Sequence, residues 1–163
     1  MHESPLTAAY DKQGLLKHVL DQFRISSQGM HGPAHWARVH HHGLKIGRVR
    51  QADLLVIELF SFLHDSQRKN EYTDRDHGNR AAEFAASLNG IFFDLNGCQL
   101  DQLCNAIRWH SDGSVEQEAT IQTCWDADRL DLGRVGIYPD SAFLSAEAAI
   151  YIETAYAWSR TGF

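Results

Sequence analysis

The stretch "LLVIELFSFLHDSQRKN", residues 54–70, decides the fold because an apolar segment ends in it abruptly at a polar pair. Its first ten residues are apolar except for Glu58 and Ser61. A helix that is apolar on every side is usually central and fully buried. His64 and Asp65 follow it directly, so we predict an imidazole and a carboxylate at the inner end of the core helix.

The rest of the chain has the apolar spacing of helices, interrupted by short polar segments. Apolar residues recur three and four positions apart, and no alternating strand pattern flanks an Asn-Gly or Asp-Gly turn. The prolines lie outside these segments or, like Pro33, at a favoured first-turn position. We therefore predict an all-α fold, a compact multi-helix bundle around the buried central helix. The predicted helices span residues 15–23, 33–49, 53–65, 77–89, 98–111, 117–132 and 145–159.

Length and composition exclude several classes of protein. The 163 residues suffice for about one domain, and the net charge of −6 disfavours nucleic acid polymers as partners. No apolar run approaches the roughly 20 residues that span a bilayer, and the start "MHESPLTAAYDKQG" lacks the features of a signal peptide. The three cysteines, Cys98, Cys104 and Cys124, are sparse and odd in number, which is typical of reduced thiols. We expect a cytoplasmic protein without a membrane partner.

Several of the predicted helices place one histidine or aspartate in the apolar stripe that faces the core. Residues three and four positions apart share a face of a helix, so each stripe can be followed along the sequence. The chain has ten histidines, and we interpret the run at 40–42 as a solvated helix face with His42 turned inward. The polar residues in these stripes are His35, His77, His110 and Asp128, and His42 lies in the same stripe as His35.

These polar stripe residues, taken together with the His-Asp pair, predict a metal site. One histidine on an apolar stripe is usually an ordinary core residue, and one aspartate is often a helix cap. Several such residues buried together need a compensating charge, because burying an unpaired carboxylate is costly. A cation at the meeting point of the helices satisfies all of them. Imidazole and carboxylate ligands without thiolate suit Mn, Fe, Co, Ni or Zn and exclude a pure-oxygen calcium site.

Three motifs in order along the chain resemble the HD-domain superfamily of metal-dependent phosphohydrolases. The segment "HGPAHWARV", residues 31–39, resembles the first histidine motif of that superfamily. The segment "FLHDSQR", residues 62–68, resembles the adjacent His-Asp pair that gives it its name. The segment "CWDADRLDLGRVGI", residues 124–137, resembles the closing DADRLD segment of small single-domain bacterial members.

The resemblance implies both a fold and a ligand set. It implies a single HD domain over residues 1–163, with a core of about 31–138 and flanking N- and C-terminal helices. It also implies hydrolysis of a phosphomonoester or phosphoanhydride by metal-activated water. The substrate would be a nucleotide or another small phosphorylated metabolite. The implied ligands of one divalent transition metal are His35, His64, Asp65 and Asp128.

The DADRLD segment offers three carboxylates, which helical geometry separates. Asp126 and Asp128 are about 200° apart on a helix, so both cannot face one metal. The stripe through Ile121 and Trp125 selects Asp128, and the alignment of the superfamily on "ADR" agrees. Asp131 lies one turn further on, where we expect it to hold a ligating imidazole in place. We interpret Asp126 as a solvent-facing or capping carboxylate.

The resemblance leaves the number of metals open. A binuclear subset of the superfamily adds two histidines between the His-Asp pair and the last aspartate, and the aspartate of the pair bridges both metals. The segments "DHGNRAAEF" and "AIRWHS" resemble these positions through His77 and His110. These two residues are therefore candidate ligands of a second metal. The alternative is that they contact phosphate or a bound water beside a single metal.

Phosphoryl transfer also needs fixed cations, because negative charge develops on the phosphoryl oxygens. Arg68 follows the His-Asp pair where related members carry a lysine, and Arg38 lies one turn after His35 on a neighbouring face of the helix. Surface arginines and lysines are otherwise mostly solvated charges. The candidate substrate-binding residues are Arg38, Arg68, His77, Lys69 and Arg134.

The candidate catalytic residues are Asp65, His110 and Arg68. Asp65 is suited both to bind metal and to steer the water, and His110 or His77 would protonate the leaving oxygen if it does not bind metal. Two other functions compete with the phosphohydrolase. Binuclear-iron members of the superfamily are oxygenases, and a third possibility is a non-catalytic, metal-dependent ligand sensor. The complete set of metal-binding residues disfavours the sensor.

Overall fold

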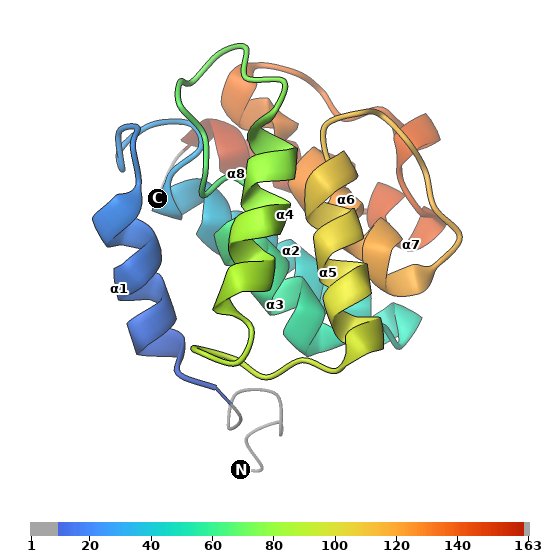
Figure 1. The fold of residues 1–163 in the computed structure, drawn as a ribbon. Helices are drawn as coiled ribbons and strands as arrows, with labels where there is room; N and C mark the ends of the chain where they lie inside the picture. Colours follow the sequence, from blue (N-terminus) through green and yellow to red (C-terminus); the bar gives the residue numbers. More distant parts are fainter. Residues whose placement is uncertain (1–9, 162–163) are drawn as a thin grey trace, which may run out of the picture.

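The computed structural model describes residues 10–161 (Figure 1). Within this range the chain forms α-helices and short 3₁₀ helices, and it has no β-strand beyond one isolated bridge. The all-α class is therefore confirmed. The α-helices are α1 (Lys12–Gln22), α2 (Pro33–Arg50), α3 (Leu54–Leu63), α4 (His77–Leu88), α5 (Gly97–Trp109), α6 (Ala119–Leu130), α7 (Ala146–Ala149) and α8 (Ile152–Thr161), and the 3₁₀ helices are η1 (Leu132–Val135) and η2 (Ser141–Phe143).

Helix α3 is the buried centre of the bundle, as the sequence predicts. All of its residues from Val56 to Leu63 are buried, and it packs against α1, α2, α4, α5 and α6. Its start is set by Asp53, whose side chain accepts hydrogen bonds from the main-chain N–H groups of Leu55 and Val56. Its end brings His64 and Asp65 into the interior, where both are at most 2% exposed.

Glu58 is the charged exception within this apolar helix, and it ties α1 and α2 to the core. Its carboxylate accepts hydrogen bonds from the Tyr10 hydroxyl at 2.5 Å and the Lys12 ammonium at 2.9 Å. His40 of α2 approaches the same carboxylate at 2.8 Å. The first residue of the "HHH" run therefore has a partner in the core helix, and it is only partly exposed to solvent.

Close helix contacts position the elements that carry the polar residues. A Cβ atom at Gly43 of α2 would lie 2.5 Å from Cγ2 of Ile57, so a larger residue would push α2 away from α3. A Cβ atom at Gly78 of α4 would lie 2.6 Å from the main-chain oxygen of Arg108 on α5. The second contact lets α4 and α5 run side by side (Figure 1). It thereby brings His77 next to the end of α5.

The C-terminal region differs from the sequence prediction. The helix expected over 145–159 is two helices, α7 and α8, separated at residues 150–151. At the break, the N–H of Tyr151 bonds to the carbonyl of Ala148 at 2.9 Å, a spacing of three residues that tightens the chain before α8 begins. The helix expected over 117–132 ends at Leu130, and η1 continues from it.

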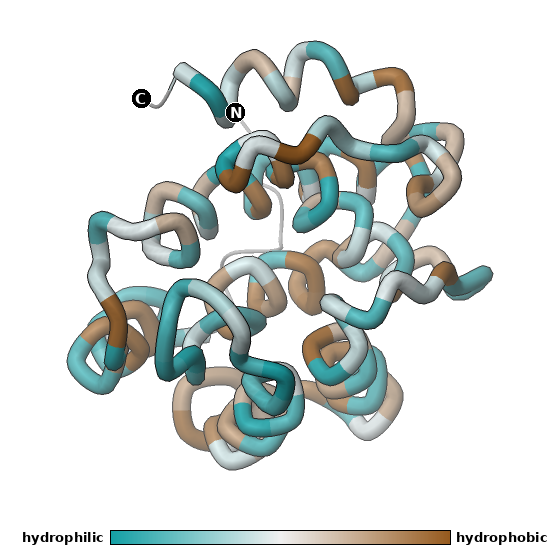
Figure 2. The backbone as a smooth tube through the Cα atoms, turned by 90° about the horizontal axis from the view of Figure 1, so that it is seen from above, coloured by the Kyte–Doolittle hydropathy of each residue, from teal (hydrophilic) through white to brown (hydrophobic). Residues whose placement is uncertain are grey.

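Hydropathy follows the helical period over most of the described chain. In Figure 2, hydrophobic and hydrophilic residues alternate around the turns of most helices, as expected when one face of each helix is buried. Among residues 10–161, no helix is long and apolar enough to cross a membrane.

Candidate metal centre

Three side chains from three helices converge in what we name the first cluster. His35 comes from α2, His64 follows α3, and Asp128 lies on α6. The Nε2 atoms of His35 and His64 are 3.0 Å apart. The Oδ1 atom of Asp128 lies 3.2 Å from Nε2 of His35 and 3.4 Å from Nε2 of His64. All three potential ligand atoms thus point at one small volume.

A second cluster lies beside the first one and consists of Asp65, His77 and His110. The Nε2 atoms of His77 and His110 are 2.9 Å apart. Each of these atoms lies 3.4 Å from Oδ1 of Asp65. All three residues are buried, with at most 5% of each exposed. The two histidines left open in the sequence therefore face each other and the aspartate of the His-Asp pair.

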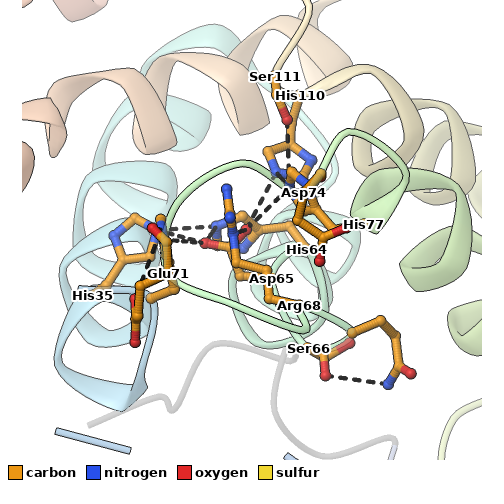
Figure 3. Close-up of polar contacts among 12 residues, drawn as sticks. His35, His64, Asp65, Ser66, Arg68, Glu71, Asp74, His77, His110 and Ser111 are labelled. Carbon is orange, nitrogen blue, oxygen red and sulfur yellow. Dashed lines mark hydrogen bonds and ion pairs between the residues drawn. The ribbon is translucent and has the colours of Figure 1, made fainter. Parts of the chain in front are cut away.

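Asp65 lies between the two clusters and presents one oxygen to each (Figure 3). Its Oδ1 atom faces His77 and His110. Its Oδ2 atom lies 3.4 Å from Nε2 of His35 and 3.4 Å from Nε2 of His64. A single carboxylate therefore contacts both pairs of imidazoles.

The hydrogen bonds of the four imidazoles define which nitrogen of each ring carries a proton. Every Nδ1 atom contacts an oxygen that can only accept a hydrogen bond, so Nδ1 must be the donor. In a neutral ring the other nitrogen, Nε2, then carries a lone pair. The pairs are His35 with Asp131 Oδ2 at 2.6 Å, His64 with Phe60 O at 3.0 Å, His77 with Asp74 O at 2.5 Å and His110 with Ile107 O at 2.6 Å.

Each cluster consequently aims two imidazole lone pairs and a carboxylate oxygen at the same point. Such an arrangement is repulsive unless a cation or a proton lies among the atoms. In the first cluster, Oδ1 of Asp128 is a buried oxygen without a hydrogen-bond partner among the described residues. Imidazole nitrogen and carboxylate oxygen form a donor set typical of divalent transition metals. The residues present therefore fit a divalent metal.

The pKa values of His64, Asp65 and Asp128 reflect the same demand for positive charge. Burial lowers the pKa of His64, but attraction to Asp65 and contact with the carboxylate of Asp128 outweigh burial and raise it to about 10. Burial raises the pKa of Asp65, but the charge of His64 and hydrogen bonds with neighbouring imidazoles hold it well below its ordinary range. The same opposition keeps the pKa of Asp128 low. The carboxylates thus stay ionised in the interior.

Comparison with known proteins found a similar fold among solved structures only. No protein-family model matches the sequence, and no curated protein matches it at a significant level. Among solved structures, the fold is similar to the crystal structure of a predicted HD superfamily hydrolase from an uncultured Thermotogales bacterium. The TM-score is 0.73 and the identity 25%, over 96% of this chain and 92% of that chain. This chain has the HD-domain fold. The likeness, together with the buried clusters, supports a metal-dependent hydrolase.

The clusters of this HD domain border a cavity of about 410 Å³. Asp65, His110 and Asp128 reach its wall. Arg68 also lines it, with Nε 3.3 Å from Oδ1 of Asp65. Arg134 lines it too, with one guanidinium nitrogen 3.7 Å from Oδ1 of Asp128. The remaining wall is largely apolar or aromatic and includes Leu132, Val135, Ile137, Tyr138 and Phe143.

The other predicted phosphate contacts lie elsewhere in the HD domain. Arg38 is 6% exposed and is absent from the described cavity wall. Its Nε donates to Oδ1 of Asp131 at 2.6 Å, behind the first cluster, which favours a positioning role over a phosphate contact. Lys69 is exposed and does not line the cavity either. His77 belongs to the second cluster, and the lone pair on His110 Nε2 favours metal binding over proton donation.

His31 also belongs to the site, although the sequence patterns did not predict it. It is 5% exposed, lines the cavity, and its Nδ1 lies 3.4 Å from Oδ2 of Asp65. Its Nε2 contacts the main-chain oxygen of Glu71 at 3.2 Å, which makes Nε2 the donor and leaves Nδ1 as an acceptor facing the site. His31 precedes α2, so no helical stripe reveals it. Its presence in the "HGPAH" motif is the only signal that the sequence offers.

The carboxylates of the DADRLD segment separate as helical geometry predicts, with one correction. Asp128 belongs to the first cluster and Asp131 supports His35. Asp126, in contrast, does not face solvent, since its exposure is 0%. It accepts hydrogen bonds from Gln122 at 2.9 Å and from the hydroxyl and main-chain N–H of Ser145 at 2.6 and 3.0 Å. Asp126 thereby anchors the residue that caps α7.

Proposed function

We propose that this HD domain is a phosphohydrolase that acts on a nucleotide or another small phosphorylated metabolite. The observation that carries the proposal is the position of Asp65, whose two oxygens face two imidazole pairs at the wall of a cavity. The guanidinium groups of Arg68 and Arg134 line the same cavity, each beside a carboxylate of the two clusters. Metal ligands next to fixed cations suit the stabilisation of a phosphoryl group.

We further propose that the site holds two divalent transition metals, drawn from Mn, Fe, Co, Ni and Zn. His35, His64, Asp128 and Oδ2 of Asp65 would hold the first, and His77, His110 and Oδ1 of Asp65 the second. The repeated arrangement of facing lone pairs supports one cation for each cluster. When bound, the metals supply Lewis acidity, which lowers the pKa of water and polarises a phosphoryl oxygen.

The chain's own residues would divide the remaining tasks. Arg68 and Arg134 would neutralise the charge that develops on the phosphoryl oxygens. His31 would accept a hydrogen bond from the water that attacks phosphorus, because its Nδ1 faces the site without a hydrogen-bond partner among the described residues. The apolar wall of the cavity would exclude bulk water and contact the organic part of the substrate.

A binuclear-iron oxygenase is the competing function, since a carboxylate between two imidazole pairs suits a di-iron site as well. The guanidinium groups in the cavity favour an anionic substrate but do not separate the two chemistries by themselves. Metal analysis of the purified protein, followed by a screen of phosphorylated metabolites with several divalent metals, tests the proposal. We expect release of phosphate or pyrophosphate. Dioxygen consumption with a mixed-valent di-iron EPR signal, and no phosphate release, would establish the oxygenase instead.

A further inference from the structure

A groove of about 400 Å³ adjoins the candidate metal centre, and two arginines that line it, Arg75 and Arg108, have no part in the proposed hydrolysis. It shares Arg68 and Ser111 with the cavity. His77 lines the groove, whereas His110, its partner in the second cluster, lines the cavity. The hydroxyl of Ser111 lies 3.4 Å from Nε2 of His77. The groove and the cavity therefore meet at the second cluster.

The groove carries positive charge that the protein itself does not neutralise. Arg75 and Arg108 both line it, and neither side chain has a hydrogen bond or ion pair within residues 10–161. Of its two carboxylates, Asp74 is paired with Arg80 at 2.6 Å. The other, Asp112, accepts a hydrogen bond from the main-chain N–H of Ser114. Arg75 and Arg108 are thus available to an external anion.

The groove differs in chemistry from the cavity. Apolar and aromatic side chains such as Leu132 and Phe143 form much of the cavity wall, whereas polar and charged residues dominate the groove. Two large aromatic rings, those of Tyr72 at 85% exposure and Trp109 at 48%, complete the wall of the groove. One substrate could therefore place an organic group in the cavity and an anionic group in the groove, with the reacting phosphorus between them.

We propose that the groove binds a terminal phosphate beyond the reacting phosphoryl group, so that the preferred substrates are organic diphosphates or longer phosphoanhydrides. This inference rests on the proposed phosphohydrolase function. In the reaction, the oxygen of water bonds to the inner phosphorus, and the bond from that phosphorus to the bridging oxygen breaks. The departing phosphate takes one water proton, the other proton goes to solvent, and Arg75 and Arg108 hold the departing group. Guanidinium groups suit this role because they bind phosphate through paired hydrogen bonds.

A binding experiment tests the groove without catalysis. The metal-loaded protein is titrated calorimetrically with methylenediphosphonate, which is not hydrolysed, and with methylphosphonate, which lacks the second anionic group. We expect the Arg75→Gln/Arg108→Gln variant to lose about ten-fold or more in affinity for methylenediphosphonate but little for methylphosphonate. The control variant is Arg48→Gln, which removes an exposed arginine near the C-terminal end of α2. Metal content is measured after each titration to exclude chelation.

Kinetics with phenyl phosphate and phenyl diphosphate separate the two proposals. If neither compound is hydrolysed but methylenediphosphonate binding still depends on Arg75 and Arg108, the phosphohydrolase fails and the groove assignment stands. If methylenediphosphonate binds equally to the wild type and the double variant, the groove assignment is overturned even when phenyl phosphate is hydrolysed. Arg108 is partly buried, so its replacement could disturb the fold, whereas Arg75 is exposed. The single variant Arg75→Glu therefore serves as a second test. We expect it to lose at least as much affinity for methylenediphosphonate as the double variant.

Discussion

The Nδ1 atom of His35 donates a hydrogen bond to Oδ2 of Asp131 at 2.6 Å, although the two residues are 96 positions apart. Asp131 is fully buried and also accepts a hydrogen bond from Arg38. The carboxylate orients the imidazole so that its Nε2 lone pair faces the first cluster. Such partners of a ligating imidazole increase its basicity and its affinity for metal.

We predict that Asp131→Asn lowers the affinity of the first site about 10-fold or more, because the imidazole loses a charged acceptor. Competition with a chelator of known affinity measures the change. Asp126→Asn is the matched control, since it replaces another buried aspartate of the same segment that does not contact a histidine of the clusters. An equal loss of metal in both variants would show that general destabilisation is responsible.

Asp128→Ala and Asp126→Ala should have opposite effects on metal content and stability. Asp128→Ala removes a ligand of the first cluster, so we expect loss of tight metal binding and of hydrolysis. Asp126→Ala removes the partner of Ser145 and should lower the free energy of unfolding by about 1–3 kcal/mol while metal content stays unchanged. Metal analysis and thermal unfolding of both variants check this. Retention of metal by Asp128→Ala would remove that residue from the ligand set.

The double variant His77→Ala/His110→Ala should lose one metal equivalent and keep the other. Two cations bridged by one carboxylate repel each other, so the second cluster should bind its metal more loosely than the first. Titration with metal, followed by elemental analysis, gives the stoichiometry of the wild type and the variant. Loss of all metal from the double variant would mean that the ligands of the first cluster have been assigned wrongly.

Arg68→Ala should raise KM for a phosphorylated substrate by about ten-fold, because a guanidinium facing the phosphoryl group is lost. Its Nε contacts Asp65 at 3.3 Å, a weak interaction, so we expect metal content to remain unchanged. Arg68→Lys should restore part of the binding, since it keeps the charge but not the paired hydrogen bonds. Unaltered kinetics in Arg68→Ala would place this residue outside the substrate site.

Glu58 should make folding stability depend on pH in the acid range. Burial raises its pKa, but hydrogen bonds with His40, Tyr10 and Lys12 outweigh burial and lower it to about 2 from the ordinary 4.5. The unfolded chain therefore binds more protons between these values, and the stabilisation is complete above pH 4.5 and is lost as the pH falls toward 2.

The variant Glu58→Gln should abolish this contribution. We expect its free energy of unfolding at neutral pH to be about 1–3 kcal/mol lower than that of the wild type, because hydrogen bonds with charged partners are weakened. Denaturant unfolding at a series of pH values measures the difference. The gap between wild type and variant should narrow as the pH falls below 4.5. A gap that stays constant over that range would contradict the role assigned to Glu58.

Some features of this protein followed from local patterns in the sequence. The apolar run from Leu54 to Leu63 determined the central helix, because an element without a polar face has to be buried on all sides. The period of the helix likewise separated Asp128 from Asp126, since residues two apart point in nearly opposite directions. These properties depend on residues within a few turns of one another.

The distances between elements depended on packing, which only the tertiary structure decided. His77 and His110 meet because α4 packs directly on the backbone of α5 at Gly78. His31 reaches Asp65 from a segment before α2, where no periodicity marks which side chains turn inward. Arg38 lies on the expected helix but pairs with Asp131, since a buried guanidinium needs the nearest carboxylate. Such contacts join residues distant in sequence, and their geometry is set by how whole helices fit together.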